Sequence, residues 1–225
     1  EPDFERVMEL APQNAAGYLL YWVANGQNLV PDFNDEFFTQ GAERAGGSIL
    51  LGWIVSLSFS EPMAEIWQPQ FDQWIEQHPD HTFAYEARGM ARIVLGDNTG
   101  AASDFYQHIQ NNQTEQIQGE PVILGKSLAL AGGLGVVYRL PFSAEAGQTV
   151  NVSEERLYAS SMVYPPTMVV LTPDGTPLPA PYSLTPDVGA STLAIRGLEI
   201  AESGVYTLLV MSNYTGQMTI RVSEA

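Results

Sequence analysis

The sequence has no cysteine and a single lysine, Lys126, and both shortages exclude classes of function. Without cysteine the chain forms no disulfide, no thiolate metal site and no cysteine nucleophile. The 26 acidic residues outnumber the 9 basic ones, which gives a net charge of −17. Such a field repels phosphate backbones, so we expect neither nucleic acid nor an anionic membrane as a partner. A basic partner or multivalent cations remain compatible, as does an acidic surface that only maintains solubility.

Long apolar runs are also missing. The best run, GGSILLGWIVSLSF at residues 46–59, is shorter than the ~20 apolar residues of a membrane span and better suits a buried helix. We therefore predict no transmembrane segment in this chain. No signal peptide is visible, and Glu1 falls within an expected element, which is compatible with removal of a leader or of earlier repeats. The hydrophobic content of 45% is that of a globular protein rather than a disordered chain.

The pattern is helical up to about residue 118. DFERVMEL places its apolar residues on one side and ends before Pro12, and FDQWIEQHP repeats this design and ends at Pro79. The two prolines lie 67 positions apart, one less than twice 34. A period near 34 is typical of tetratricopeptide-type helical hairpins.

The segment AYEARGMARIVLGDNTGAASDF fits this period best. Tyr85 and Phe105 occupy aromatic positions, Gly89 and Ala101 occupy small positions, and Gly96–Asp97 supplies the turn. Small residues let two helices approach, and the aromatic residues fill the space around that contact. The segment resembles a tetratricopeptide repeat, and the resemblance extends over residues 1–115, with roughly three repeats and a trailing helix.

The other repeats are degenerate. Trp22 and Trp67 stand where the family has small residues, which indicates irregular packing. The resemblance implies that the first helices of the repeats line a concave groove that binds a protein. The groove residues that it implies are Leu19, Val23, Glu86, Met90 and Ile93. An acidic groove would favour a basic or extended segment. The alternative, that these side chains pack against neighbouring helices, stays open.

After residue 118 the hydrophobic period changes to two. The strands that this period predicts are residues 136–143, 148–153, 167–172, 191–197, 205–211 and 217–223. Turns with Gly or Pro separate them, which favours an antiparallel, jelly-roll-like β-sandwich. We predict two domains, α then β, each with its own core. Residues 1–118 would be helical repeats, residues 119–130 a linker and residues 131–225 the sandwich.

The β half contains three motifs in a recognisable order. Gly147 lies in a turn between the first strands, Asp174–Gly175 in a hairpin, and Ser203–Gly204–Val205–Tyr206 at the start of a late strand. Together they resemble the bacterial pre-peptidase C-terminal (PPC) domain over about 90 residues. The resemblance implies a secreted or surface location in a bacterium. The acids at which some members bind calcium are absent from GGLGVVY and YPPTMVVL, so no metal site is expected there.

HPDH at residues 78–81 is the one motif with metal-ligand spacing. Two histidines three apart can bind a metal on a continuous helix, but Pro79 breaks that geometry. We expect a turn between helices, with a metal site or a pH-sensitive contact as alternatives. AGGLG at residues 131–135 precedes a strand rather than a helix, so we expect no nucleotide there and no cofactor in the chain.

Catalytic motifs are missing as well. GxSxG and HExxH are absent, and the three histidines, His78, His81 and His108, all lie in the helical half. We therefore predict a non-catalytic extracytoplasmic adaptor or assembly subunit. A carbohydrate- or matrix-binding module is the alternative, and an accessory piece cut from a larger enzyme is a third. The module would need exposed aromatic residues, for which the candidates are Tyr158, Tyr164, Tyr182 and Tyr214.

Overall fold

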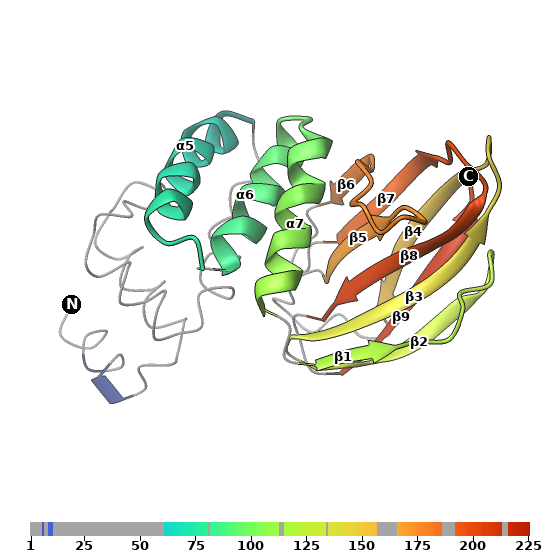
Figure 1. The fold of residues 1–225 in the computed structure, drawn as a ribbon. Coiled ribbons are helices and arrows are strands. Elements are labelled where there is room, and N and C mark those ends of the chain that lie inside the picture. Colours follow the sequence, from blue (N-terminus) through green and yellow to red (C-terminus); the bar gives the residue numbers. More distant parts are fainter. Residues whose placement is uncertain are drawn as a thin grey trace.

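The computed structural model has helices first and two sheets after them (Figure 1). It describes residues 6, 9–10, 61–80, 82–112, 115–133, 135–156, 166–185, 192–212 and 216–225. The helices named in this part of the chain are α5 (Glu61–Gln77), α6 (Thr82–Val94) and α7 (Asn98–Asn112). The predicted order, α then β, is confirmed.

Two sheets form the β half. The four-stranded sheet has the order β1-β3-β8-β5, and the five-stranded sheet has the order β2-β9-β4-β7-β6. The strands are β1 (Glu115–Gln118), β2 (Ser127–Gly132), β3 (Val136–Ala144), β4 (Thr149–Arg156), β5 (Thr167–Leu171), β6 (Tyr182–Thr185), β7 (Thr192–Glu199), β8 (Gly204–Met211) and β9 (Gly216–Glu224). The six period-two segments of the sequence coincide with β3, β4, β5, β7, β8 and β9. The short strands β1, β2 and β6 are additional.

The two sheets pack face to face. Tyr138, Leu140 and Phe142, at every second position of β3, are buried. They belong to the same buried cluster as Val150 and Val152 of β4 in the other sheet. Because alternate side chains of a strand point to opposite faces, this pattern places the shared core between the sheets, as in a β-sandwich.

One strand pair departs from the predicted antiparallel arrangement. β1 runs parallel to β3, with Glu115 opposite Val136. Between these strands the chain forms β2 in the other sheet. It therefore returns to β3 after a crossover, which is the connection that a parallel pair requires.

The segment between β1 and β2 follows the edge of the sandwich. The Gly119 N–H donates to the Arg139 carbonyl oxygen at 3.0 Å, and the Val122 N–H donates to the Pro141 carbonyl oxygen at 2.8 Å. Val122 is also buried. These contacts hold the segment against β3.

Helices α6 and α7 form a hairpin around the predicted Gly96–Asp97 turn. Gly96 has φ of 78°, which a residue with a side chain rarely adopts. Its N–H donates to the Ile93 carbonyl, and the Asp97 N–H donates to the Arg92 carbonyl, which closes the end of α6. Asp97 Oδ1 accepts a hydrogen bond from the Gly100 N–H at 2.8 Å, so the same turn caps the start of α7.

The hairpin helices approach closely at Gly89. A Cβ atom at this position would lie 2.7 Å from Cε1 and 2.9 Å from Cδ1 of Phe105, which is closer than packed carbon atoms come. Ala101, the other predicted small residue, is fully buried. The helix contact predicted for this hairpin is therefore present. The array of tetratricopeptide-like repeats stays a prediction, because the earlier repeats fall largely outside the described residues.

Ion pairs join the three helices. From α6, the Arg88 guanidinium contacts Asp104 of α7 and Asp72 of α5, each at 2.7 Å. Arg92 Nη1 contacts Asp104 Oδ2, also at 2.7 Å. Burial raises the pKa of Asp104, while the hydrogen bonds and charges of Arg88 and Arg92 act against that rise.

The expectation of two separate cores is wrong. Buried apolar side chains of the helices belong to one cluster with those of both sheets. Helix α7 contacts β5, and α6 contacts β6. The hairpin leaves part of its apolar surface uncovered by its own partner helix, and the sheets bury that part.

The HPDH segment forms a turn in the part that the structure describes. Residues 79–80 turn between α5 and α6, as expected, while His81 lies outside the described residues. The His78 ring packs against Trp74 with centroids 4.3 Å apart, and the Tyr85 hydroxyl donates to the Pro79 carbonyl at 3.0 Å. In the described ranges, no group of three or more His, Cys, Asp or Glu side chains is placed to hold a metal ion. None of the described helices combines the length and apolarity needed to cross a membrane.

Candidate functional site at the seam between helices and sheets

The helical hairpin meets the sheets at a seam that we define by five side chains: Glu86, Phe105, His108, Thr167 and Tyr182. Helix α6 supplies Glu86, α7 supplies Phe105 and His108, and β5 and β6 supply the other two. All five side chains are buried. Buried polar groups are uncommon in a chain of this size, so their contacts decide what the seam can do.

The polar part of the seam is centred on the Glu86 carboxylate. The Thr167 hydroxyl donates a hydrogen bond to Glu86 Oε1 at 2.7 Å. His108 Nε2 lies 3.5 Å from the other carboxylate oxygen, Oε2. His108 Nδ1 lies 2.8 Å from the backbone oxygen of Thr82, which fixes the ring against the start of α6. These contacts offset part of the cost of removing a carboxylate from water.

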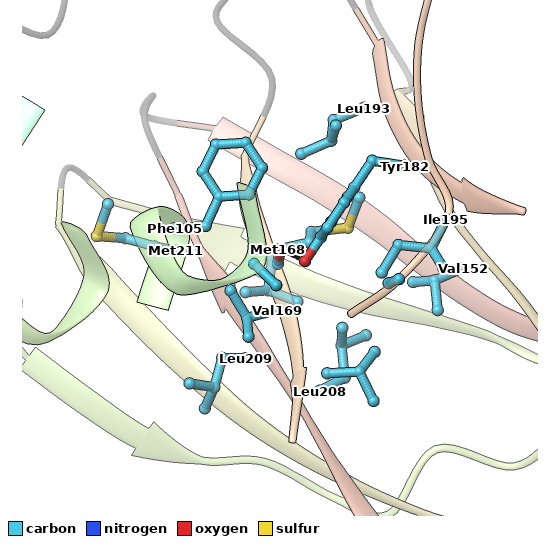
Figure 2. Close-up of a cluster of buried hydrophobic side chains, with 14 of the residues drawn as sticks. Phe105, Val152, Met168, Val169, Tyr182, Leu193, Ile195, Leu208, Leu209 and Met211 are labelled. Carbon is cyan, nitrogen blue, oxygen red and sulfur yellow. Dashed lines mark hydrogen bonds between the residues drawn. The ribbon is translucent and has the colours of Figure 1, made fainter. Parts of the chain in front are cut away.

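The apolar part of the seam is an aromatic contact (Figure 2). The rings of Phe105 and Tyr182 meet edge to face, with centroids 5.4 Å apart and planes 84° apart. The Tyr182 hydroxyl donates to the Met168 carbonyl oxygen of β5 at 3.2 Å. Burial raises the pKa of Tyr182, so the hydroxyl keeps its proton. Phe105 thus packs on Gly89 of the neighbouring helix and also on the sheet.

The residues predicted to line a protein-binding groove lie partly in this seam. Glu86 and Met90 are each only 1% exposed, and Ile93 is half-buried against the core cluster. Their spacing of four and three residues places them on one face of α6, as predicted. In this structure that face is covered by the rest of the molecule. Leu19 and Val23 lie outside the described residues.

The tyrosines predicted to bind carbohydrate have one described member. Tyr182 is buried in the seam, so its ring is not available to stack on a sugar. The other three, Tyr158, Tyr164 and Tyr214, lie outside the described residues.

Carboxylate, imidazole and hydroxyl are the components of a hydrolytic triad, but the seam orders them differently. In a triad the hydroxyl contacts an imidazole nitrogen and the acid holds the opposite nitrogen. Here the Thr167 hydroxyl contacts the acid, and His108 Nδ1 contacts a backbone oxygen. Thr167 and His108 are also at most 1% exposed. The arrangement holds the helices on the sheet and does not activate Thr167 as a nucleophile.

Sequence reasoning did not select His108 or Thr167. His108 follows Ala101 by seven residues and Phe105 by three, so it lies on the apolar face of α7. A polar residue on a core-facing stripe is a signal that could have been read. Thr167 opens a strand and carries no comparable signal, because its role depends on which helix lies above it.

Two of the three turns behind the PPC resemblance are in contact. The Ala146 N–H, beside Gly147, donates to Ser203 Oγ at 2.9 Å, so the first and third motifs touch. The Tyr206 hydroxyl donates to the Glu202 carbonyl at 2.8 Å and fixes the start of β8.

The sequence matches no protein-family model and no curated protein. Among solved structures, the chain is similar to the pre-peptidase C-terminal domain of a collagenase from Bacillus anthracis. The two share 14% sequence identity with a TM-score of 0.30, and the match covers 49% of this chain and 95% of that domain. The sandwich assignment depends on the two packed sheets themselves.

Proposed function

We propose that the chain is a non-catalytic adaptor or assembly subunit that works outside the cytoplasm of a bacterium. The observation that carries this proposal is the continuous core of the helices and the two sheets. Contacts across the seam, Glu86 with Thr167 and Phe105 with Tyr182, reinforce that core. In the described residues, helices and sheets with a shared core form one unit rather than two hinged domains, which suits a component that holds another protein in a fixed place.

The proposed location is supported by motifs rather than by measurement. Gly147, Asp174–Gly175 and Ser203–Tyr206 resemble the PPC family, whose members are mainly secreted or on the bacterial surface. The tetratricopeptide-like hairpin supports protein binding, because arrays of such hairpins present grooves that hold peptide segments.

The proposed partner is a protein with a basic or extended segment. The chain carries −17, most of it in the first 120 residues, and Glu61, Glu65 and Glu76 of α5 are exposed. Opposite charges accelerate and orient such an encounter. Glu86 and Met90 are not proposed as partner contacts, because both side chains are buried within the molecule.

Affinity capture with the intact chain, from native membranes and culture medium, tests the proposal. We expect one protein partner that re-forms a stoichiometric complex from purified components, with an affinity that falls as salt is raised from 50 to 500 mM because the ionic contacts are screened. Retention on insoluble polysaccharide without any protein partner would instead support the carbohydrate-binding alternative. A complex whose affinity does not change with salt would rule out the charge-based part of the proposal.

A further inference from the structure

Each sheet of the sandwich ends in two edge strands in the part of the chain that the structure describes, β1 and β5 in one sheet and β2 and β6 in the other. An edge strand directs every second pair of N–H and C=O groups away from its sheet, where another strand can bind them. Proteins protect such edges with covering segments, charges or short strands.

Three of these four edges are protected. The chain after β5 folds back over its edge, where the Leu178 N–H donates to the Val170 carbonyl at 2.8 Å and Leu171 forms a β-bridge with Pro177. Strand β6 has four residues and contacts α6. Strand β1 also has four residues and begins with the exposed Glu115.

Strand β2, with the sequence SLALAG, has none of these protections among the described residues. It has six residues without a charge or a proline, and each of them pairs with β9 without a bulge. Ala129 and Ala131 are exposed and small, so they would not block an approaching strand, while Leu130 is buried in the core. Figure 1 shows β2 along the lower edge of the sandwich.

Both ends of β2 are held by hydrogen bonds within the chain. Just before the strand, the Gly125 N–H donates to the Val222 carbonyl at 2.7 Å. Near its end, the Tyr138 hydroxyl donates to the Ala131 carbonyl at 2.7 Å, and a carbonyl oxygen can accept a second bond. A strand that is already fixed in an extended conformation loses little entropy when it pairs.

The charges around β2 indicate which occupant fits this edge. Two copies of a chain with net charge −17 repel each other and approach most easily where neither surface is acidic. The paired residues 127–132 of β2 and 216–221 of β9 include no acid, and Lys126 precedes them. By contrast, α5 exposes Glu61 and Glu65.

We propose that β2 is a dimerisation edge, at which β2 of a second copy of this chain pairs in antiparallel orientation and joins the two five-stranded sheets. A twofold axis at Ala129 sets this residue opposite its own copy and Leu128 opposite Leu130 of the second copy. Because alternate side chains share a face, the half-buried Leu128 then continues the apolar inner face. The inference goes beyond the proposed partner, because it requires only this chain.

Sedimentation velocity of the intact chain at protein concentrations up to about 1 mM tests the proposal. We expect a reversible monomer–dimer equilibrium, because one strand pair buries less area than a standard interface. Ala129→Lys places two ammonium groups opposite each other and should weaken the dimer at least about fivefold. Ala201→Lys makes the same change at an exposed turn position and should keep the wild-type affinity. A wild type that stays monomeric, or equal effects of the two variants, would overturn the proposal.

Salt separates this dimer from the proposed partner complex. Raising salt from 50 to 500 mM screens the repulsion between two acidic copies, so the dimer should become stronger, whereas the partner complex should become weaker. Failure to capture a partner therefore leaves the dimer intact as a hypothesis, and a monomeric chain leaves the partner hypothesis intact. A dimer that dissociates as salt is raised would contradict pairing at this acid-free edge.

Single-cysteine variants test the register, because the natural chain has no cysteine. Residues opposite each other in an antiparallel pair have Cα atoms about 4.5–5.5 Å apart, within the range of a disulfide. Mild oxidation of Ala129→Cys should therefore give a covalent dimer several times faster than oxidation of Ala201→Cys. Equal rates would show that the β2 edges do not meet at Ala129. This small substitution also covers the case in which Ala129→Lys does not fold.

Discussion

Asp104 and Glu86 are buried to nearly the same extent, at 2% and 1% exposure, yet the molecule compensates them differently. Asp104, between α6 and α7, receives three hydrogen bonds of 2.7–2.9 Å from two guanidinium groups, those of Arg88 and Arg92. Glu86, at the seam, accepts a hydrogen bond from the Thr167 hydroxyl at 2.7 Å and lies 3.5 Å from the imidazole of His108.

The difference distinguishes the contact between the helices α6 and α7 from the contact between the hairpin and the sheets. Guanidinium groups stay charged at any physiological pH, so the arginines between the two helices keep their positive charge throughout this range. At the helix–sheet seam, Glu86 instead meets the hydroxyl of Thr167 from β5 and the imidazole of His108 from α7. The hairpin is therefore held together by guanidinium–carboxylate pairs, which the printed contacts of the seam do not repeat.

Removing the Asp104 carboxylate should cause the largest loss. Asp104→Ala leaves the guanidiniums of Arg88 and Arg92, 14% and 18% exposed, without their main counter-charge. We expect a loss of about 3 kcal/mol in the free energy of unfolding, at the lower end for broken buried pairs because both groups reach some water. Urea denaturation measures the change. Asp72→Ala is the matched control, since its side chain is 48% exposed, and should lose less than about 1 kcal/mol. Equal losses of stability in Asp104→Ala and Asp72→Ala would show that the burial of the carboxylate does not determine its contribution.

Gly89→Ala tests how tightly the hairpin is packed. Alanine normally stabilises a helix relative to glycine by about 1 kcal/mol. Here the added Cβ would meet the Phe105 ring at 2.7 Å, so we expect a net loss of about 2 kcal/mol from overpacking. Thermal or urea unfolding gives the sign. The double variant Gly89→Ala/Phe105→Leu should lose less than the sum of its two single variants, because the smaller side chain makes room. A stabilised Gly89→Ala would contradict the close helix contact.

The sequence predicts the hairpin better than it predicts the seam, for a physical reason. Gly89, Phe105 and the Gly96–Asp97 turn lie within 17 positions of one another, so their roles follow from local spacing. Period two likewise locates six strands, but β1 with EQIQ and β6 with YSLT are too short to show a period. Their pairing partners lie elsewhere in the chain, so the local sequence pattern does not predict these two strands.

The seam depends on contacts between distant positions. Thr167 is 81 positions from Glu86, and Tyr182 is 77 from Phe105. Sequence reasoning assigned Glu86 to a groove and Tyr182 to a carbohydrate surface, because each suits exposure in its own half. Once the halves share one core, both become interior residues. Patterns within each half cannot show that the halves pack together.

Thr167→Val measures how much the hydroxyl contact at the seam contributes to the free energy of unfolding. Valine keeps the shape but removes the hydroxyl that donates to Glu86 Oε1. We expect a loss of about 1.5 kcal/mol, smaller than for Asp104→Ala, because the variant removes one uncharged hydrogen-bond donor to a buried carboxylate. Thr207→Val on β8 makes the same chemical change at a half-buried position, where the side chain has no hydrogen bond to the described residues, and should stay within about 0.5 kcal/mol of the wild type. A loss at Thr167 no larger than at Thr207 would show that the seam's hydroxyl is dispensable.

Substitution of Asp174 should cause the smallest loss of stability. Its carboxylate differs from that of Glu86 in being exposed. Both carboxylates accept a hydrogen bond from a threonine hydroxyl, but Asp174 lies in an exposed turn. The Thr172 hydroxyl and then the Thr176 N–H lower the pKa of Asp174, so its contribution is present above the unfolded value and is lost as the pH falls through the folded one. An NMR titration should place its midpoint below the ordinary aspartate value of about 3.9. Asp174→Asn should destabilise the chain less than Thr167→Val. If it destabilised as much, the difference between the buried and the exposed carboxylate would not come from burial, because the same kind of donor serves both.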